Sequence, residues 1–153
     1  MKKRIFSLLL ALCLVAGMLP TVAYAYNNGG GNTIDSGTFD EEVSNAGIIN
    51  GGTFNNTVTN TPGSYINNGT FNGIVYSRGG CQITGGTFNN EVNNDSASDY
   101  ILGGTFNATV NNNSGATIRG GTFNGTVNNR STAKIEDGTF YSTVNNNVDS
   151  DIR

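Results

Sequence analysis

The side chains that could do chemistry in this chain are carboxylates, hydroxyls and thiols, because its 153 residues include no histidine. Without imidazole, Ser/His/Asp or Cys/His nucleophilic catalysis and histidine-ligated metal sites are excluded. The acidic residues are mostly isolated, apart from Asp40-Glu41-Glu42 and Glu136-Asp137. No segment has the alternating Asp/Asn pattern of a calcium-binding loop. We therefore interpret both clusters as solvated surface and predict no catalytic residue, no metal ligand and no cofactor.

The first 25 residues have the three parts of a secretory signal peptide. A basic start (residues 2–4) precedes an apolar stretch (5–19), and Ala23-Tyr24-Ala25 is a small-residue cleavage motif. The apolar stretch ends at Pro20, short of the roughly 20 residues that span a bilayer. We predict cleavage after Ala25, a secreted or cell-surface location, and no membrane insertion of the mature chain.

Cleavage changes the charge and leaves a single thiol. Three of the eight basic residues are lost, so five remain against eleven acids, a net charge of −6. Nucleic-acid and anionic-membrane partners are not expected, because such binding draws on clustered cations. Cys81 has no second cysteine to pair with, and we interpret it as a small core residue. The remaining cations are scattered: Arg78, Arg119, Arg130, Lys134 and Arg153.

The dominant feature of the sequence is an internal repeat of about 17 residues. The tripeptide Gly-Thr-Phe occurs seven times, and successive phenylalanines are 15, 17, 17, 18, 17 and 17 residues apart. In every copy an isoleucine lies five residues before the phenylalanine and a valine four residues after it. One repeat cannot bury three apolar side chains alone, whereas stacked repeats bury them against one another.

These three apolar positions are expected to line a shared, dry interior. The repeats are rich in Thr, Ile, Val and Phe and punctuated by Gly and Asn, which is typical of short strands joined by turns. Beyond the first repeat, the predicted core residues are Ile49, Phe54, Val58, Ile66, Phe71, Val75, Ile83, Phe88, Val92, Ile101, Phe106, Val110, Ile118, Phe123, Val127, Ile135, Phe140 and Val144.

Turn-forming residues predict two corners in each repeat. Ile and Phe are five residues apart, so both can point inward only if the chain bends between them, and a glycine two residues before every Phe permits that bend. Phe and Val are expected on one face of a single strand, together with the residue midway between them. A second corner is expected where asparagine pairs follow the valines, at Asn93-Asn94, Asn111-Asn112, Asn128-Asn129 and Asn145-Asn146.

The predicted fold is therefore all-β: a parallel β-solenoid of about seven coils over residues 34–153, one repeat per coil, after a lead-in at residues 26–33. Neighbouring coils would be about 4.8 Å apart. A disordered Gly/Asn/Ser-rich tract is the alternative, but such tracts do not hold Phe, Val and Ile in fixed register. Ile152 begins an eighth repeat, so we expect a C-terminal end that is either truncated from a longer surface protein or stacked end to end on another copy.

The unit Ile-x-x-Gly-Thr-Phe-x-x-x-Val-x-Asn resembles the short parallel β-helix repeats of secreted and cell-surface bacterial proteins of the adhesin or stalk type. The resemblance covers Ile34 to the C-terminus and is one of architecture. It implies a secreted, elongated scaffold, and a shared fold does not by itself specify a function.

Outward positions around the phenylalanines suggest a contact surface of hydroxyls and amides. The leading hypothesis is a non-catalytic structural or adhesive module that contacts glycans or host and cell-surface proteins by avidity. Exposed tyrosines are expected to contribute: Tyr65, Tyr76, Tyr100 and Tyr141. The candidate contact residues are Thr53, Asn55, Thr57, Thr87, Asn89, Thr105, Asn107, Thr109, Thr122, Asn124 and Thr126.

Two alternatives remain open. The run Thr-x-Asn-x-Thr would place hydroxyls about 6.7 Å apart along a strand and about 4.8 Å apart between coils, an array similar to that of ice-binding solenoids. Ile74, Glu91 and Glu42 interrupt the second Thr column of that array. A polysaccharide-active β-helix enzyme is the less favoured alternative, because its chemistry needs acids clustered on one face.

Overall fold

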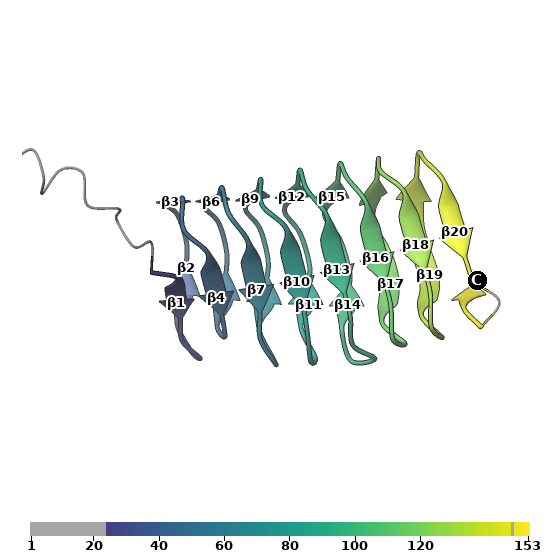
Figure 1. The fold of residues 1–153 in the computed structure, drawn as a ribbon, viewed down its shortest axis with the longest axis horizontal. Coiled ribbons are helices and arrows are strands. Elements are labelled where there is room, and N and C mark those ends of the chain that lie inside the picture. The colour runs from purple at the N-terminus through teal and green to yellow at the C-terminus, as the bar shows by residue number, and fades with distance from the viewer. Residues whose placement is uncertain (1–23, 148) are drawn as a thin grey trace, which may run out of the picture.

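The computed structural model describes residues 24–147 and 149–153, so the signal peptide predicted for residues 1–25 lies outside the described residues apart from Tyr24 and Ala25. This part of the chain forms an all-β parallel solenoid of about seven turns, without a helix. Figure 1 shows the turns side by side along the long axis of a rod. The fold class predicted from the repeat is confirmed.

One sheet of the solenoid contains eight strands, which are β1 in the lead-in and one strand from each of the seven repeats. Except in the first strand, each strand begins at the repeat's valine and includes the next two residues. The strands are β1 (Tyr26–Asn28), β4 (Val43–Asn45), β7 (Val58–Asn60), β10 (Val75–Ser77), β13 (Val92–Asn94), β16 (Val110–Asn112), β18 (Val127–Asn129) and β20 (Val144–Asn146).

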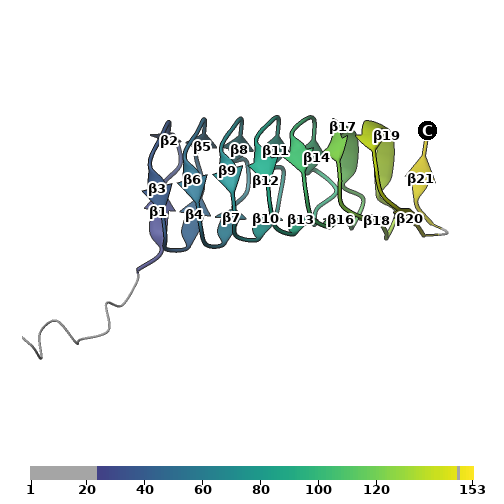
Figure 2. The ribbon, with the colours of Figure 1, turned by 90° about the horizontal axis from the view of Figure 1, so that it is seen from above.

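The other sheet contains two rows of short strands, and Figure 2 shows all three rows running along the rod. Strands that end at the repeat's isoleucine are β2 (Thr33–Ile34), β5 (Ile48–Ile49), β8 (Tyr65–Ile66), β11 (Gln82–Ile83), β14 (Tyr100–Ile101) and β21 (Asp151–Ile152). Strands that end at the phenylalanine are β3 (Thr38–Phe39), β6 (Thr53–Phe54), β9 (Thr70–Phe71), β12 (Thr87–Phe88) and β15 (Thr105–Phe106). Two longer strands, β17 (Thr117–Phe123) and β19 (Lys134–Phe140), belong to both rows.

Every strand pair is parallel and joins equivalent positions of neighbouring repeats. Phe54 is in register with Phe71, and Thr53 is in register with Thr70. The register begins within the range assigned to the lead-in, because Asn28 in β1 is already in register with Asn45 in β4. It continues to Ile152, which is in register with Ile135.

The interior holds the isoleucine, phenylalanine and valine of each repeat. All of these side chains are buried in the central turns, whereas Phe39, Phe140 and Val144 in the end turns are only partly buried. Successive phenylalanine rings stack with centroids 4.7–4.9 Å apart and planes within 8° of parallel. At the N-terminal end the Tyr26 ring meets Phe39 edge-on, with centroids 5.0 Å apart, and so covers that end of the stack.

The glycine corner is confirmed in all seven repeats. The glycine two residues before each phenylalanine has a φ between +108° at Gly86 and +148° at Gly138. This is a backbone conformation that residues with a Cβ rarely adopt. The bend resets the alternation of side chains, so the isoleucine before it and the phenylalanine after it both face the interior.

Differences in repeat length are confined to the corner that follows the Val-x-Asn strand. This corner has two residues between β4 and β5, five between β13 and β14, and four in the other turns. Those differences account for the spacings of 15 and 18 residues between phenylalanines. The strands keep their register because insertions at a surface corner leave the backbone pairing unchanged.

Two local predictions were wrong. Phe and Val do not share one strand, because the chain bends between them, as at Asn56 between β6 and β7. The residue midway between them therefore lies at a corner; Asn56 and Asn90 are exposed there. The asparagine pairs that follow the valines are not corners either. They continue the strand, and Asn94 and Asn112 are fully buried.

The phenylalanine stack predicts which substitutions destabilise the rod. Phe88 is fully buried between two parallel rings, so Phe88→Ala is expected to lower the free energy of unfolding by about 3–5 kcal/mol through lost burial and a cavity. Thr109→Ser, at a half-buried position, is expected to change it by no more than about 0.5 kcal/mol. Urea unfolding followed by circular dichroism measures both, and equal effects would contradict the packing described above.

Candidate functional site

The asparagines expected to form a contact surface are hydrogen-bonded to one another. The Nδ2 of each donates to the side-chain oxygen one turn nearer the N-terminus, over 2.6–2.9 Å. This outer ladder runs along the corner that follows the phenylalanines. Its members are Asp40, Asn55, Asn72, Asn89, Asn107 and Asn124. Their amides therefore hold neighbouring turns together and are only partly free to bind a partner.

Other outer ladders have the same polarity, and each ends on a carboxylate. On the eight-stranded sheet, one such ladder ends at Glu91, which accepts from Asn93. Its other members, each donating to the one before it, are Asn111, Asn128 and Asn145. Beside the isoleucine row, Asn67 donates to Asn50, which donates to Asp35. An ionised carboxylate accepts hydrogen bonds but cannot donate them. The acids are therefore suited to terminate chains of amide donors, which gives Asp35, Asp40 and Glu91 a structural role.

The threonine next to each phenylalanine forms a continuous outer column. Equivalent threonines are in register through all seven repeats. In the described part of the chain, none of their hydroxyls has a hydrogen-bond partner. This column, which we call the threonine column, consists of Thr38, Thr53, Thr70, Thr87, Thr105, Thr122 and Thr139. It is an uninterrupted surface column whose hydroxyls the fold leaves free.

The remaining predicted contact threonines lie on the other side of the bend. Thr57, Thr109 and Thr126 each immediately precede a strand of the eight-stranded sheet, whereas Thr53 lies in the other sheet. Ile74 occupies the equivalent position between Thr57 and the later members. The two threonine columns therefore do not lie on one strand, as the ice-binding alternative assumed.

A third kind of ladder, inside the rod, was not predicted. The last residue of each strand in the eight-stranded sheet is a buried asparagine, except for Ser77 in β10 and the exposed Asn146 in β20. Five of these asparagines donate through Nδ2 to the Oδ1 of the asparagine one turn nearer the C-terminus, over 2.7–2.8 Å. This inner ladder consists of Asn28, Asn45 and Asn60, then Asn94, Asn112, Asn129 and Asn146. The spacing of two residues from the valine could have revealed it, because residues two apart on a strand share a face.

The inner ladder also bonds to the corner that follows the Val-x-Asn strand, where the repeats differ in length. The Nδ2 of Asn112 donates to the carbonyl oxygens of Ala116 at 3.2 Å and Lys134 at 3.0 Å, in addition to the Oδ1 of Asn129. Asn129 makes equivalent bonds to Ala133 and Asp151. Backbone carbonyls near the corner are thereby satisfied inside the rod, where water cannot reach them freely.

Cys81 and Asp99 lie in adjacent turns at these corners and are both buried. The Sγ of Cys81 donates to the carbonyl oxygen of Thr61 at 3.2 Å, so its interpretation as a core residue is confirmed. The Oδ1 of Asp99 accepts from the backbone N–H groups of Gly80 at 2.7 Å and Cys81 at 2.8 Å. Desolvation raises the pKa of Asp99 above its ordinary value, although these backbone donors act in the opposite direction.

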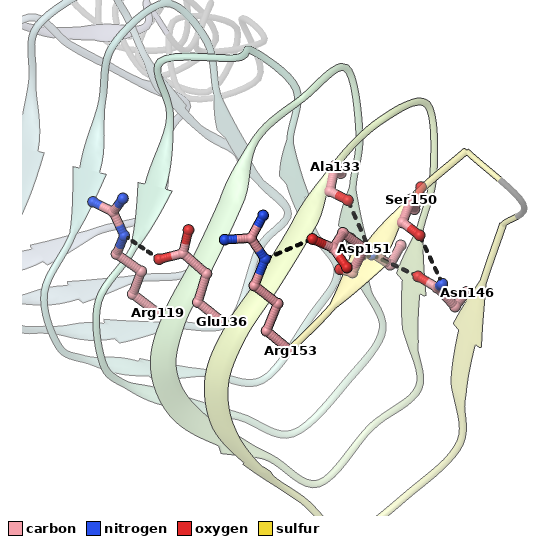
Figure 3. Close-up of polar contacts among 8 residues, drawn as sticks. Arg119, Ala133, Glu136, Asn146, Ser150, Asp151 and Arg153 are labelled. Atoms are coloured by element: carbon pink, nitrogen blue, oxygen red, sulfur yellow. Dashed lines mark hydrogen bonds and ion pairs between the residues drawn. The ribbon is translucent and has the colours of Figure 1, made fainter.

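The second acidic cluster is partly paired. Glu136 accepts from the Nε of Arg119 at 2.7 Å (Figure 3), and this contact lowers the pKa of Glu136. The same guanidinium lies over the ring of Tyr100, 4.7 Å from its centroid. Arg78 covers Tyr76 in the same way at 4.6 Å. Two of the four tyrosines expected to be exposed are thus half-covered by arginines, whereas Tyr65 and Tyr141 are exposed.

Within residues 24–147 and 149–153, no three His, Cys, Asp or Glu side chains are grouped so as to hold a metal ion. The same residues include no helix with the length and hydropathy needed to span a membrane. Comparison of the chain with protein-family models, curated proteins and solved structures finds no significant match.

The inner and outer ladders are expected to differ in their contribution to stability. Asn112→Ala would leave the Nδ2 of Asn94 and the Oδ1 of Asn129 without their partner. Burying such groups unpaired is expected to cost at least about 2 kcal/mol in unfolding free energy. Asn89→Ala in the exposed outer ladder is the matched control, and water can replace its partners at a cost below about 1 kcal/mol. Urea denaturation of both variants tests this, and a larger effect at Asn89 would contradict it.

Asp99 is expected to make the rod less stable as the pH rises. Because its pKa is raised in the folded state, the folded chain binds this proton more tightly than the unfolded chain. Stability from this group is therefore greatest below its ordinary value of 3.8 and is lost as the pH passes through the raised value. Asp99→Asn keeps the acceptor oxygen without the charge. Its Tm should equal that of the wild type near pH ~3 and exceed it near pH ~7, and parallel Tm curves would disprove the assignment.

Proposed function

We propose that the chain is a secreted, non-catalytic structural rod whose threonine column makes repeated, weak contacts with polymeric glycans at a cell surface. The single observation that carries the proposal is the contrast between the two outer polar columns. The asparagine amides are occupied in bonds between turns, whereas the threonine hydroxyls have no partner in the described chain. The rod thus combines a scaffold whose amides bond to one another with a column of free hydroxyls that no other residue type interrupts.

The geometry of the column favours a repeating ligand. Its hydroxyls recur once per turn, about 4.8 Å apart, so seven of them extend over roughly 30 Å. A single threonine hydroxyl contributes little binding energy, because it must give up a bond to water. Many weak contacts on one rigid support add up through effective concentration. A glycan chain presents hydroxyls at regular intervals and can use several of these positions at once.

The acids and the net charge support a non-catalytic, non-nucleic-acid role. Asp35 and Asp40 terminate amide ladders, and Glu136 pairs with Arg119. Each of these carboxylates therefore has a structural partner. The net charge of −6 after cleavage would repel anionic polymers such as nucleic acids. Neutral glycans are the polymers that this surface fits best.

A polysaccharide and glycan array tests the proposal with two matched variants. Thr87, Thr105 and Thr122 are changed together to Val, which keeps the branched shape and strand preference but removes the hydroxyls. The control changes Thr57, Thr109 and Thr126 to Val on the other side of the bend. Wild type and control are expected to bind the same glycans, and the Thr87/Thr105/Thr122 variant is expected to lose at least about tenfold in affinity. Equal binding by all three proteins would contradict the role of the column. Binding of none of them would leave a spacer function.

A further inference from the structure

The inner asparagine ladder is interrupted at one position. Ser77 in β10 is in register with Asn60 on one side and Asn94 on the other. Serine lacks the carboxamide that the other turns provide at this position, so it cannot supply both an acceptor and a donor to its two neighbours at the ladder's spacing. The inner ladder is therefore divided into an N-terminal segment ending at Asn60 and a C-terminal segment beginning at Asn94.

Three polar atoms around this interruption are buried and unpaired. The Nδ2 of Asn60, the Oγ of Ser77 and the Oδ1 of Asn94 have no hydrogen-bond partner among the described residues, and all three residues are fully buried. Asn60 supplies a donor, Asn94 supplies an acceptor, and the serine hydroxyl between them can do either. A buried polar group without any hydrogen-bond partner lowers the stability of the folded chain by about 1–3 kcal/mol.

We propose that one ordered water molecule is bound inside the rod beside Ser77. The water and the serine hydroxyl together replace the acceptor and the donor of the missing carboxamide. The hydrogen bonds then keep the direction of the inner ladder, from the Nδ2 of Asn60 to the Oδ1 of Asn94. A buried water needs two to four polar partners and room for about one water molecule. Three such atoms lie on three successive turns around this position, and a serine in place of an asparagine leaves the room.

The chemistry of the site distinguishes water from an ion. A cation would face the amide donor of Asn60, and an anion would face the carbonyl oxygen of Asn94. A neutral molecule that both accepts and donates has no such conflict. Water is the smallest molecule with this property and the one that fits beside a fully buried serine. The site therefore continues the ladder without adding charge to the interior.

Water contacts of side-chain amides, measured by NMR on 15N-labelled mature protein, test the site directly. The side-chain amide protons of Asn60 are expected to show a cross-peak with bound water, and Ser77→Asn is expected to abolish it by restoring the carboxamide. Asn112→Ser is the matched control in an unbroken part of the inner ladder. It is expected to create a new water cross-peak at Asn94. A folded wild type without a water cross-peak at Asn60 would overturn the proposal.

Thermal unfolding of Ser77→Asn gives an independent result. If the site holds water, the carboxamide introduced by Ser77→Asn replaces hydrogen bonds that the water already makes. Only the entropy cost of holding the water is then removed, so Tm should rise by roughly 2–8 °C. If the site were dry, three unpaired groups would be relieved and Tm should rise by more than about 10 °C. A lower Tm in a folded variant would show that there is no room beside Ser77. Either of the last two results would contradict the proposal. If Ser77→Asn failed to fold, the presence or absence of the wild-type water cross-peak at Asn60 would decide.

Discussion

Parallel pairing of like residues, one turn above the next, is the constraint on which the rest of the structure depends. At a separation of about 4.8 Å, a residue meets its own equivalent in the neighbouring turns. Phenylalanine therefore stacks on phenylalanine, and asparagine donates to asparagine. Both arrangements suit identical partners, because flat rings stack with an offset and a carboxamide carries both a donor and an acceptor. The repeated sequence is the direct consequence.

The same constraint separates structural from free polar groups on the surface. A carboxamide can bond to the turn above and the turn below, so an asparagine column becomes part of the scaffold. A hydroxyl on a threonine is too short to reach its equivalent, so the threonine column stays free. The last amide of each outer ladder donates a hydrogen bond to a group that accepts and does not donate. Carboxylates fill this role at Asp35 and Asp40 in the first turn. Surface chemistry in this rod thus follows from side-chain length as much as from polarity.

The repeat made the fold, the inward apolar residues and the glycine corner predictable, because period and residue type carry that information directly. The bend between phenylalanine and valine was missed, since residues such as Asn56 and Ala108 there do not require a turn. Burial of Asn94 and Asn112 was missed because asparagine is typical of turns and surfaces. Its place two residues after valine is the signal in the sequence, because residues two apart on a strand share a face. The free state of the threonine hydroxyls depends on distances between turns, which a single sequence does not contain.

Residue-resolved hydrogen exchange on a chain that begins at Tyr26 tests the central claim most directly. In-register turns predict slow exchange of the strand amides from β7 to β16, with a pattern that recurs once per repeat and includes the residue after each buried valine. Protection should decrease gradually toward β1 and β20, where a strand has a neighbour on one side only. Rapid exchange throughout, or protection that does not recur with the repeat, would contradict the stacked, hydrogen-bonded solenoid.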